Sequence, residues 1–432
     1  MSYSFSGRTL RAAVSVLAFC AADQAQAAGF YIKEMSVSGL GRAFAGAPAA
    51  ADDASTVWFN PAGMTSLPAS EVDAAVNVIA PQAKLTNDGS KKYDGTSFQP
   101  ATDSSKQTPY DATPIPNLFG VLRDAERGLA LGIGVTAPFG MANEYSESWF
   151  GRFDSVKTDL QTTNYSLVGA YDVNRYLTVG GGVDYQTVDV TLTSMKNNSG
   201  PELHSTLEGN DNGIFGFNAG VLVHATPDTQ VGLTYRSGFT HHVEGTATLR
   251  SGSSSGAIVS QYAATADLGL PALASLGVKH RLTGKLTLMG DVSYYEWSAF
   301  DAIKVYKIAD GVLKEDIPQN YKDTVSFGFG ADYAYDDALT LRAGVQYDPT
   351  PTRDGYRTSR TPDSDRTWIS GGLTYKMSDN LLVDAALTYI YLADTRLDLN
   401  RSASVGGATT AIVGADVEGY IGIASVALRY RF

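Results

Sequence analysis

The chain has 432 residues, of which 44 are glycine, 24 are tyrosine and one is cysteine; 18% are charged, and the net charge is −12. Glycine exceeds its usual share of about 7% and charge falls below the usual quarter, which excludes a disordered chain and is atypical of a cytosolic enzyme. The acidic balance argues against a nucleic-acid partner, because binding phosphates requires a basic surface.

The first 27 residues have the form of an export signal. Arg8 and Arg11 precede an uncharged, mostly apolar run over 12–22, and Ala25-Gln26-Ala27 supplies the small-x-small pattern of a signal-peptidase site. We expect cleavage after Ala27, which also removes Cys20, the one cysteine. An exported chain without disulfides needs another source of stability, and a large hydrogen-bonded sheet provides it.

Residues 28–68 form the next unit and lack sustained alternation of apolar and polar residues. They are rich in alanine, glycine and serine, with scattered turn signals. Small side chains of this kind pack compactly enough to plug the lumen of a barrel. We expect an N-terminal hatch here, and the alternative is a free periplasmic tail.

From residue 70 to the end, apolar and polar residues alternate with period two, the pattern of β-strands. In the last strand Leu428, Tyr430 and Phe432 share one face while Arg429 and Arg431 share the other. No later run of apolar residues reaches the roughly 18 residues that a membrane helix requires. The alternation predicts fourteen strands, at 70–85, 115–123, 128–136, 158–172, 175–194, 212–225, 229–249, 261–282, 285–307, 322–335, 338–348, 366–376, 380–396 and 417–432.

These strands fit either a soluble sandwich, with the apolar face inside, or a membrane barrel, with that face in lipid. The connections decide between them. Short polar turns, such as those at Asn174 and Pro227-Asp228, alternate with long loops such as 137–157 and 349–365. Short turns at one end and long loops at the other are typical of transmembrane barrels with an even number of strands. We therefore predict an all-β fold, a 14-stranded antiparallel transmembrane β-barrel over 69–432 with the hatch inside its lumen.

Motifs spread over nearly the whole mature chain resemble the FadL/TodX (OMPP1) family of outer-membrane transporters of long-chain fatty acids and aromatic hydrocarbons. The matching pieces are Ala28-Gly29-Phe30, Ser38-Gly39-Leu40-Gly41-Arg42-Ala43, Ala51-Asp52-Asp53-Ala54, Asn60-Pro61-Ala62, Ala137-Pro138-Phe139-Gly140, Leu233-Thr234-Tyr235-Arg236-Ser237, Tyr321-Lys322-Asp323, and Pro362-Asp363 with Asp365-Arg366. The ending Tyr430-Arg431-Phe432 also looks like the signal by which barrels reach the barrel-assembly machinery.

The resemblance implies a location in the outer membrane of a Gram-negative bacterium, surrounded by outer-membrane lipid, and we expect a monomer. It implies a hatch that gates the lumen, here with Gly41, Arg42, Asn60, Pro61 and Ala62. It also implies a kink in the third strand that opens the wall, with Asn60, Pro61 and Ala62 beside it. The kink falls on Pro138, Phe139 and Gly140. From the residues alone, proline and glycine at this point either interrupt the pairing or merely end the strand.

The function implied is passive uptake of hydrophobic compounds that bind in the barrel and leave sideways through the wall, without catalysis. Long-chain fatty acids come first, aromatic hydrocarbons by the same route are the alternative, and a general porin comes last because an open pore needs no plug. Lys196, Lys314 and Lys322 are candidates for holding a carboxylate. Trp149 and Phe150 are candidates either for capturing solutes or for anchoring the loop at the membrane interface.

Two further patterns carry no chemistry. Gly252-Ser253-Ser254-Ser255-Gly256 matches the string of a nucleophile elbow, but that elbow requires a strand before it and a helix after it. His241 and His242 are adjacent in a strand, so they face opposite ways and cannot chelate one metal ion together. We expect no enzyme activity, no metal and no cofactor.

Overall fold

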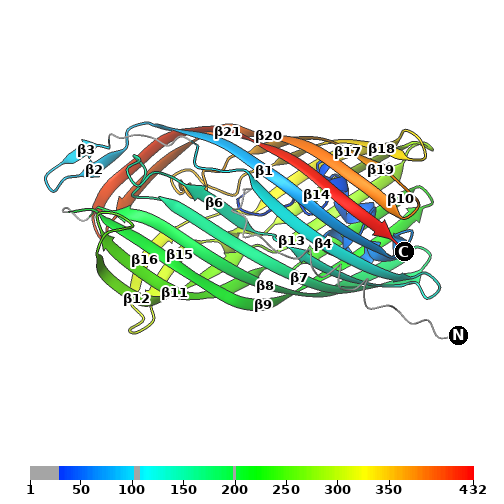
Figure 1. Cartoon of the computed structure of the whole chain (residues 1–432), viewed down its shortest axis with the longest axis horizontal. Coiled ribbons are helices and arrows are strands. Elements are labelled where there is room, and N and C mark those ends of the chain that lie inside the picture. The colour runs from blue at the N-terminus through cyan, green and yellow to red at the C-terminus, as the bar shows by residue number, and fades with distance from the viewer. Residues whose placement is uncertain (1–28, 102–107, 198–200) are drawn as a thin grey trace.

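The computed structural model describes residues 29–101, 108–197 and 201–432, so the expected signal peptide lies outside the described residues. The strands form one antiparallel sheet that closes on itself into a fourteen-stranded barrel (Figure 1). Closure joins the first strand to the last, with Glu71 opposite Arg431 and Val78 opposite Ala424. A closed barrel leaves no unpaired edge in its wall, which suits long strands. The predicted fold class is confirmed.

Nine wall strands are continuous and five run in two pieces. The continuous ones are β1 (Glu71–Asn87), β4 (Thr113–Asp124), β7 (Lys157–Asn174), β8 (Leu177–Lys196), β9 (Leu203–Thr226), β18 (Leu339–Asp348), β19 (Arg366–Lys376), β20 (Leu381–Ser402) and β21 (Thr409–Arg431). The divided ones are β5 (Leu129–Thr136) with β6 (Gly140–Glu144), β10 (Thr229–Arg236) with β11 (Phe239–Ser251), β13 (Leu273–Arg281) with β12 (Ile258–Leu270), β14 (Leu286–Tyr295) with β15 (Ala302–Lys307), and β17 (Thr324–Ala334) with β16 (Leu313–Pro318).

The apolar side of the alternation faces outward. Leu131 is 63% exposed, Ile133 is 59% exposed and Leu387 is 69% exposed. Their neighbours Gly132, Gly134 and Thr388 point inward. A soluble sandwich would bury the apolar side, so the alternation here is that of a barrel that meets lipid.

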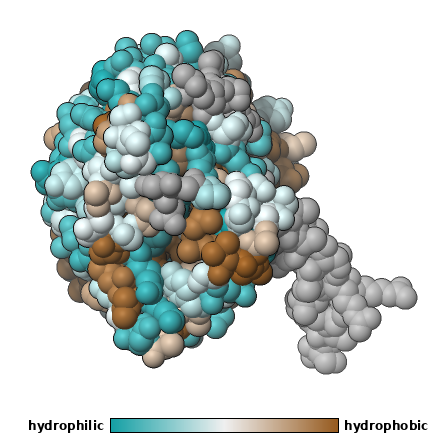
Figure 2. All heavy atoms as spheres, turned by 90° about the vertical axis from the view of Figure 1, so that its left-hand side faces the viewer, coloured by the Kyte–Doolittle hydropathy of each residue, from teal (hydrophilic) through white to brown (hydrophobic). Residues whose placement is uncertain are grey.

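The two ends of the barrel differ in the way the loop lengths predict. Short turns and the C-terminus lie at one end, where the hatch also sits, and the long connections lie at the other (Figure 1). A small hairpin, β2 (Lys91–Tyr93) and β3 (Phe98–Pro100), projects from the long-loop end and pairs with β21 through Lys91 and Lys92. Figure 2 views that end, where patches of hydrophobic residues lie among hydrophilic ones.

The hatch is confirmed as a compact unit inside the barrel. Its helices are single turns: α2 (Val37–Leu40), α3 (Ala47–Ala50), α4 (Thr56–Phe59) and the 3₁₀ turn η1 (Pro61–Ser66). Ser36 caps α2 by accepting from the Gly39 N–H, and Asn60 caps η1 by accepting from the Ala62 N–H at 3.1 Å. Among the described residues no helix is long and apolar enough to cross a membrane.

Small residues on both partners let the hatch approach the wall closely. A Cβ on Gly180 of β8 would lie 2.5 Å from the Ala62 nitrogen, and one on Gly232 of β10 would overlap the Pro48 carbonyl oxygen. The high glycine content therefore has a structural cause, because lumen-facing glycines make room for the backbone of the hatch.

The predicted strands are present, but their outer ends are longer than predicted. β9 begins at Leu203 rather than 212 and β21 at Thr409 rather than 417, while β6, β16 and the β2–β3 hairpin were predicted as loops. In these outer parts the outward face carries polar residues such as Glu208 and Asn210. With polar residues on both faces the alternation fades, although the backbone pairing continues.

Candidate functional site

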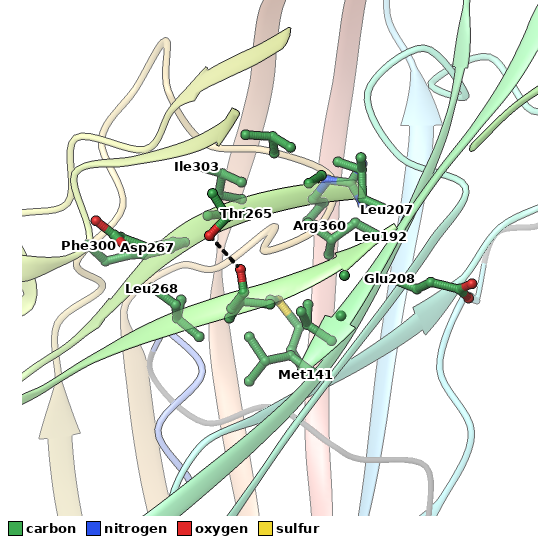
Figure 3. Close-up of a pocket in the computed structure, with 18 of the residues that line it drawn as sticks. Met141, Leu192, Leu207, Glu208, Thr265, Asp267, Leu268, Phe300, Ile303 and Arg360 are labelled. Atoms are coloured by element: carbon green, nitrogen blue, oxygen red, sulfur yellow. Dashed lines mark hydrogen bonds between the residues drawn. The ribbon is translucent and has the colours of Figure 1, made fainter. Parts of the chain in front are cut away.

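An apolar cavity lies inside the barrel toward the long-loop end. It has a volume of about 80 Å³, several times the roughly 10–15 Å³ that one water needs. In Figure 3, Met141, Leu192 and Leu207 point toward one another while Glu208 points away. The apolar side chains of its lining are aliphatic and aromatic and include Met141, Leu160, Leu192, Leu207, Val243, Leu268 and Phe300. Such a surface binds a solute through apolar burial.

A cleft lined by three lysines lies directly outside this cavity along the same strands. Its volume is about 360 Å³, and it is lined by Lys196, Lys307 and Lys314 together with Tyr262. On β8, Lys196 lies four residues beyond Leu192 of the cavity. Glu315 pairs with Lys196 at 2.8 Å, and Asp310 with Lys307 at 3.2 Å. The two spaces together have a cationic entrance and an apolar interior, which is the polarity of an amphiphilic anion.

This arrangement brings together two of the three lysines predicted from the sequence. Lys196 and Lys314 line the lysine cleft, but Lys322 is exposed and lines a different cleft with Arg353 and Tyr356. Of the two alternatives for the second cation, Lys314 therefore lies with Lys196 and Lys322 does not. The residues just before β17 form part of the barrel's outer surface, where the neighbouring Asp323 accepts from the outward-facing Tyr294 hydroxyl at 2.6 Å.

Arg360 is a cavity residue that the sequence did not reveal. It lies in the loop between β18 and β19, far along the chain from the other lining residues, and no strand pattern precedes it. Its guanidinium donates to the Asp154 carbonyl at 3.0 Å and to the Thr193 carbonyl at 3.1 Å. Arg360 thus ties the 349–365 loop to the cavity wall and puts a cation at the cavity's edge.

Trp149 and Phe150 are 0% and 1% exposed, so they neither capture solutes from outside nor anchor in the membrane interface. Their loop folds into the mouth, where Trp149 stacks on Tyr145 with ring centroids 3.9 Å apart. Both readings predicted for this pair are wrong, because period and loop length do not show that a loop turns inward. The exposed apolar residues of this end include Ile258, Val259, Ile308 and Val312.

Asp154 joins the two loops that fold into the mouth, 137–157 and 349–365, which we call the mouth loops. Its carboxylate accepts from the Ser359 N–H at 2.6 Å and pairs with Arg401 at 2.6 Å. Burial alone raises the pKa of this carboxyl, but Arg401 and Arg360 oppose burial and the pKa ends below its ordinary value. Asp154 is therefore ionised at neutral pH and holds the mouth closed through charge.

Aromatic rings form the floor of the cavity. Phe300 lines the cavity and also packs against Phe30 of the hatch, with centroids 5.1 Å apart. Phe30 further contacts Trp297 at 5.0 Å and Phe139 at 6.1 Å. Trp297 begins a 3₁₀ turn, η2 (Trp297–Ala299), where the ninth wall strand leaves its ladder. The start of the hatch therefore lies between this break and the break in the third strand.

The third strand is interrupted at 137–139, and the hatch occupies the interruption. The Ile32 N–H donates to the Pro138 carbonyl at 2.8 Å, and the Gly140 N–H donates to the Phe30 carbonyl at 3.0 Å. On the side of the second strand, the ladder ends where Leu118 faces Val135. Among the described residues, no strand pairs with residues 113–117 on that side. Pro114 and Pro116 in this stretch lack N–H donors, so the sequence itself carries a signal that pairing fails here.

The other hatch residues lie away from this break. The Asn60 amide donates to the Pro48 carbonyl at 2.6 Å and to the Val221 carbonyl of β9 at 3.1 Å. The expectation that Asn60, Pro61 and Ala62 lie beside the kink is wrong for Asn60, because these contacts hold it at the sixth strand. Gly41 packs on the backbone of Gly372 of β19.

Arg42 lies in a network of charges between hatch and wall. Its guanidinium pairs with Asp52 at 2.7 Å and reaches Asp332 of β17 at 3.4 Å. Lys279 of β13 pairs with the same Asp52 at 2.7 Å. Asp52 thus bridges two cations, one on the hatch and one on the wall.

The adjacent histidines and the serine-rich loop lie apart from the transport route. The Asp211 carboxylate accepts from His241 Nδ1 at 3.0 Å while His242 Nδ1 contacts Asp267 at 2.7 Å, so the two rings diverge as their adjacency predicts. Within the described ranges, no group of three or more His, Cys, Asp or Glu residues has the arrangement of a metal site. The loop Gly252–Gly256 is followed by β12 rather than by a helix.

Comparisons with known proteins agree with this geometry. The family model described as "Outer membrane protein transport protein (OMPP1/FadL/TodX)" matches residues 18–432. Outer membrane protein P1 of Haemophilus influenzae is 32% identical over 429 residues, covering 89% of this chain and 90% of that protein. The long-chain fatty acid transport protein of Escherichia coli (strain K12) is 27% identical, covering 88% and 92%.

Solved structures share the fold. A Pseudomonas aeruginosa FadL homologue superposes with a TM-score of 0.84 at 24% identity, over 94% of this chain and all of that one. The Ralstonia pickettii toluene transporter TbuX gives a TM-score of 0.62 at 22% identity, over 88% and 94%. The chain therefore belongs to the FadL/TodX family of Gram-negative outer-membrane proteins, which are channels for hydrophobic substrates and not enzymes.

Proposed function

We propose that the channel takes up long-chain fatty acids. The observation that carries this proposal is the lysine cleft directly above the apolar cavity, since a cationic entrance over an apolar interior fits a carboxylate with an acyl tail. Charge-assisted bonds hold the carboxylate, and each methylene that leaves water contributes about 0.8 kcal/mol. The similarity to the Escherichia coli long-chain fatty acid transport protein supports the same substrate class.

Uptake begins at the exposed apolar residues of the mouth. Ile308 lies beside β12, its N–H donating to the Ala263 carbonyl at 3.0 Å, and Lys307 of the lysine cleft precedes it in the chain. An acyl chain caught on this apolar lip is therefore next to the lysine cleft. Its carboxylate then binds Lys196 and Lys314 while its tail enters the cavity.

The solute leaves sideways through the break in the third strand. A long chain exceeds a cavity of about 80 Å³, so Phe300 and Phe30 move aside as the chain enters. Because the backbone of Phe30 and Ile32 is bonded to the break at Pro138 and Gly140, displacement of Phe30 also releases that stretch of wall. Lateral exit keeps the tail out of water throughout.

A second candidate is a monoaromatic hydrocarbon. The observation in its favour is the size of the cavity, since a compact ring needs less displacement of the aromatic floor than a long chain does. The two candidates differ in their need for cations, because a neutral ring gains nothing from the lysine cleft.

Uptake by cells that lack their own channel tests the proposal. We expect Lys196→Ala with Lys314→Ala to lower uptake of a labelled long-chain fatty acid by about tenfold or more, because the loss of even one charge-assisted bond has about that effect. Uptake of toluene should be unchanged, and Lys91→Ala on the exposed hairpin is the matched control. Unchanged fatty-acid uptake at equal surface expression would show that the lysines do not hold the carboxylate, and an equal loss for toluene would assign them a structural role.

A further inference from the structure

A polar cleft on the outer surface of the barrel is separate from the transport route. It has a volume of about 640 Å³ and lies between the residues before β17, the 349–365 loop and β20. Its lining combines cations, hydroxyls, acids and one aromatic ring: Lys322, Arg353, Thr350, Thr352, Ser364, Asp365, Asp394 and Tyr356. The transport cavity shares none of these residues.

The cleft lies just above a row of outward-facing tyrosines. Tyr347 is 45% exposed on the lipid side, and its hydroxyl donates to Asp365 of the cleft at 2.8 Å. Tyr294, 40% exposed, donates to Asp323, the residue after Lys322, at 2.6 Å. Tyrosines on the outer face of a barrel mark the boundary between hydrocarbon and head groups. The cleft is therefore at the depth of the lipid head groups, on the long-loop side.

Some charged side chains of the cleft already have partners within the protein, and others do not have an ion-pair partner among the described residues. Asp354 pairs with Arg357 at 2.8 Å, and Asp365 accepts from Tyr347 and from the Thr350 N–H at 3.0 Å. Within the part of the chain that the structure describes, Lys322 has no ion-pair partner, and Arg353 is held only through its Nε–H, which donates to the Asn320 carbonyl at 2.9 Å. Two exposed cations are thus available to an anion, while the exposed Asp394 offers bonds to neutral polar groups. The Thr350 and Thr352 hydroxyls bond each other and Asp363 instead.

We propose that this cleft binds the phosphorylated sugar head group of an outer-leaflet glycolipid, the lipopolysaccharide of the Gram-negative outer membrane. Lys322 and Arg353 hold a phosphate, as charge-assisted donors do. Asp394 and Thr395 bond the sugar hydroxyls, and the acyl chains lie on the apolar wall below the tyrosines. A simple phosphate would leave the Asp394 side of the cleft unused, and a phospholipid head group carries too few hydroxyls for it.

Native mass spectrometry of the detergent-purified full chain, titrated with lipid A, tests this assignment. The Lys322→Glu/Arg353→Glu variant should require about tenfold more lipid A for half occupancy, the effect of losing about 1.4 kcal/mol. The matched control is Lys91→Glu/Arg175→Glu, which makes the same change of charge at exposed sites on the hairpin and on the opposite end of the barrel. We expect this control to bind lipid A as the unchanged chain does.

Equal lipid A binding by the cleft variant and the control would overturn the proposal. Dephosphorylated lipid A should bind weakly to the unchanged chain, and phosphatidylglycerol should not compete with lipid A at equal concentration. Competition by phosphatidylglycerol would overturn the assignment to a sugar head group. Heat-modifiable migration on a gel verifies that the barrel is folded, and Lys322→Gln provides a milder variant if the double substitution prevents assembly.

Discussion

Arg42 attaches the hatch to the wall by charge. It pairs with Asp52 at 2.7 Å and lies 3.4 Å from Asp332, and all three side chains are at least four-fifths buried. Removing one partner of a buried pair typically costs about 3–5 kcal/mol, because the other charge is left uncompensated. We expect Arg42→Met to loosen the hatch while the barrel stays folded. Hydrogen exchange over residues 36–53 should accelerate, and unchanged exchange would mean that Lys279 alone is enough to hold Asp52.

The hatch approaches the wall closely at Gly232, where an added methyl group tests how tightly α3 is docked. A Cβ there would overlap the Pro48 carbonyl, so Gly232→Ala must displace α3 and destabilise the docked hatch by about 1–3 kcal/mol. Gly422→Ala is the matched control, since nothing lies within 4 Å of the Cβ it would add. Faster exchange at residues 46–50 in the first variant alone is expected; equal exchange in both would show that α3 tolerates the added methyl.

The third strand is interrupted because it has one residue more than the neighbouring fourth strand at this point. Thr136 faces Asn164 and Gly140 faces Gln161, so residues 137–139 lie against only two residues of the fourth strand, 162–163. One surplus residue reverses the inward set, from even positions in β5 to odd positions in β6, as a bulge does. The sequence provided the proline and glycine of this break but not the count, because the partner strand's register is a property of the folded sheet.

Deleting Pro138 should remove the surplus and let the third strand pair continuously. We expect fatty-acid uptake to fall to the level of cells without the channel, while heat-modifiable folding is retained. Deleting Gly406, in the exposed turn between β20 and β21, controls for the loss of one residue at a site without close contacts. Normal uptake after the Pro138 deletion, with the channel at the cell surface, would rule out exit through this break.

At the scale of the whole molecule, the sequence predicts the features that follow from contact with lipid and from strand periodicity. It does not predict which loop residues pack inside the lumen. Outward alternation, loop lengths and the small-residue composition of 28–68 were sufficient for barrel and hatch. The inward fold of Trp149 and Phe150, the position of Arg360 and the outward position of Lys322 were not predictable. These depend on which loop segments meet inside a closed wall, a long-range property that local pattern does not carry.

The lumen is obstructed twice, by the hatch at the short-turn end and by the mouth loops that Asp154 joins. Deleting residues 28–68 removes only the first obstruction. We expect the truncated barrel to conduct ions in a planar bilayer where the full chain conducts almost none. Adding Asp154→Ala, which releases Ser359 and Arg401, should raise the conductance further.

The control is deletion of residues 91–100, which removes the β2–β3 hairpin outside the mouth and should leave conductance unchanged (Figure 1). The wall keeps its ladder in every variant, so differences in conductance report the obstructions rather than loss of the barrel. If the hatch deletion conducts no better than the full chain and only the added Asp154→Ala opens it, the mouth loops are the principal seal. The hatch would then serve the wall opening alone.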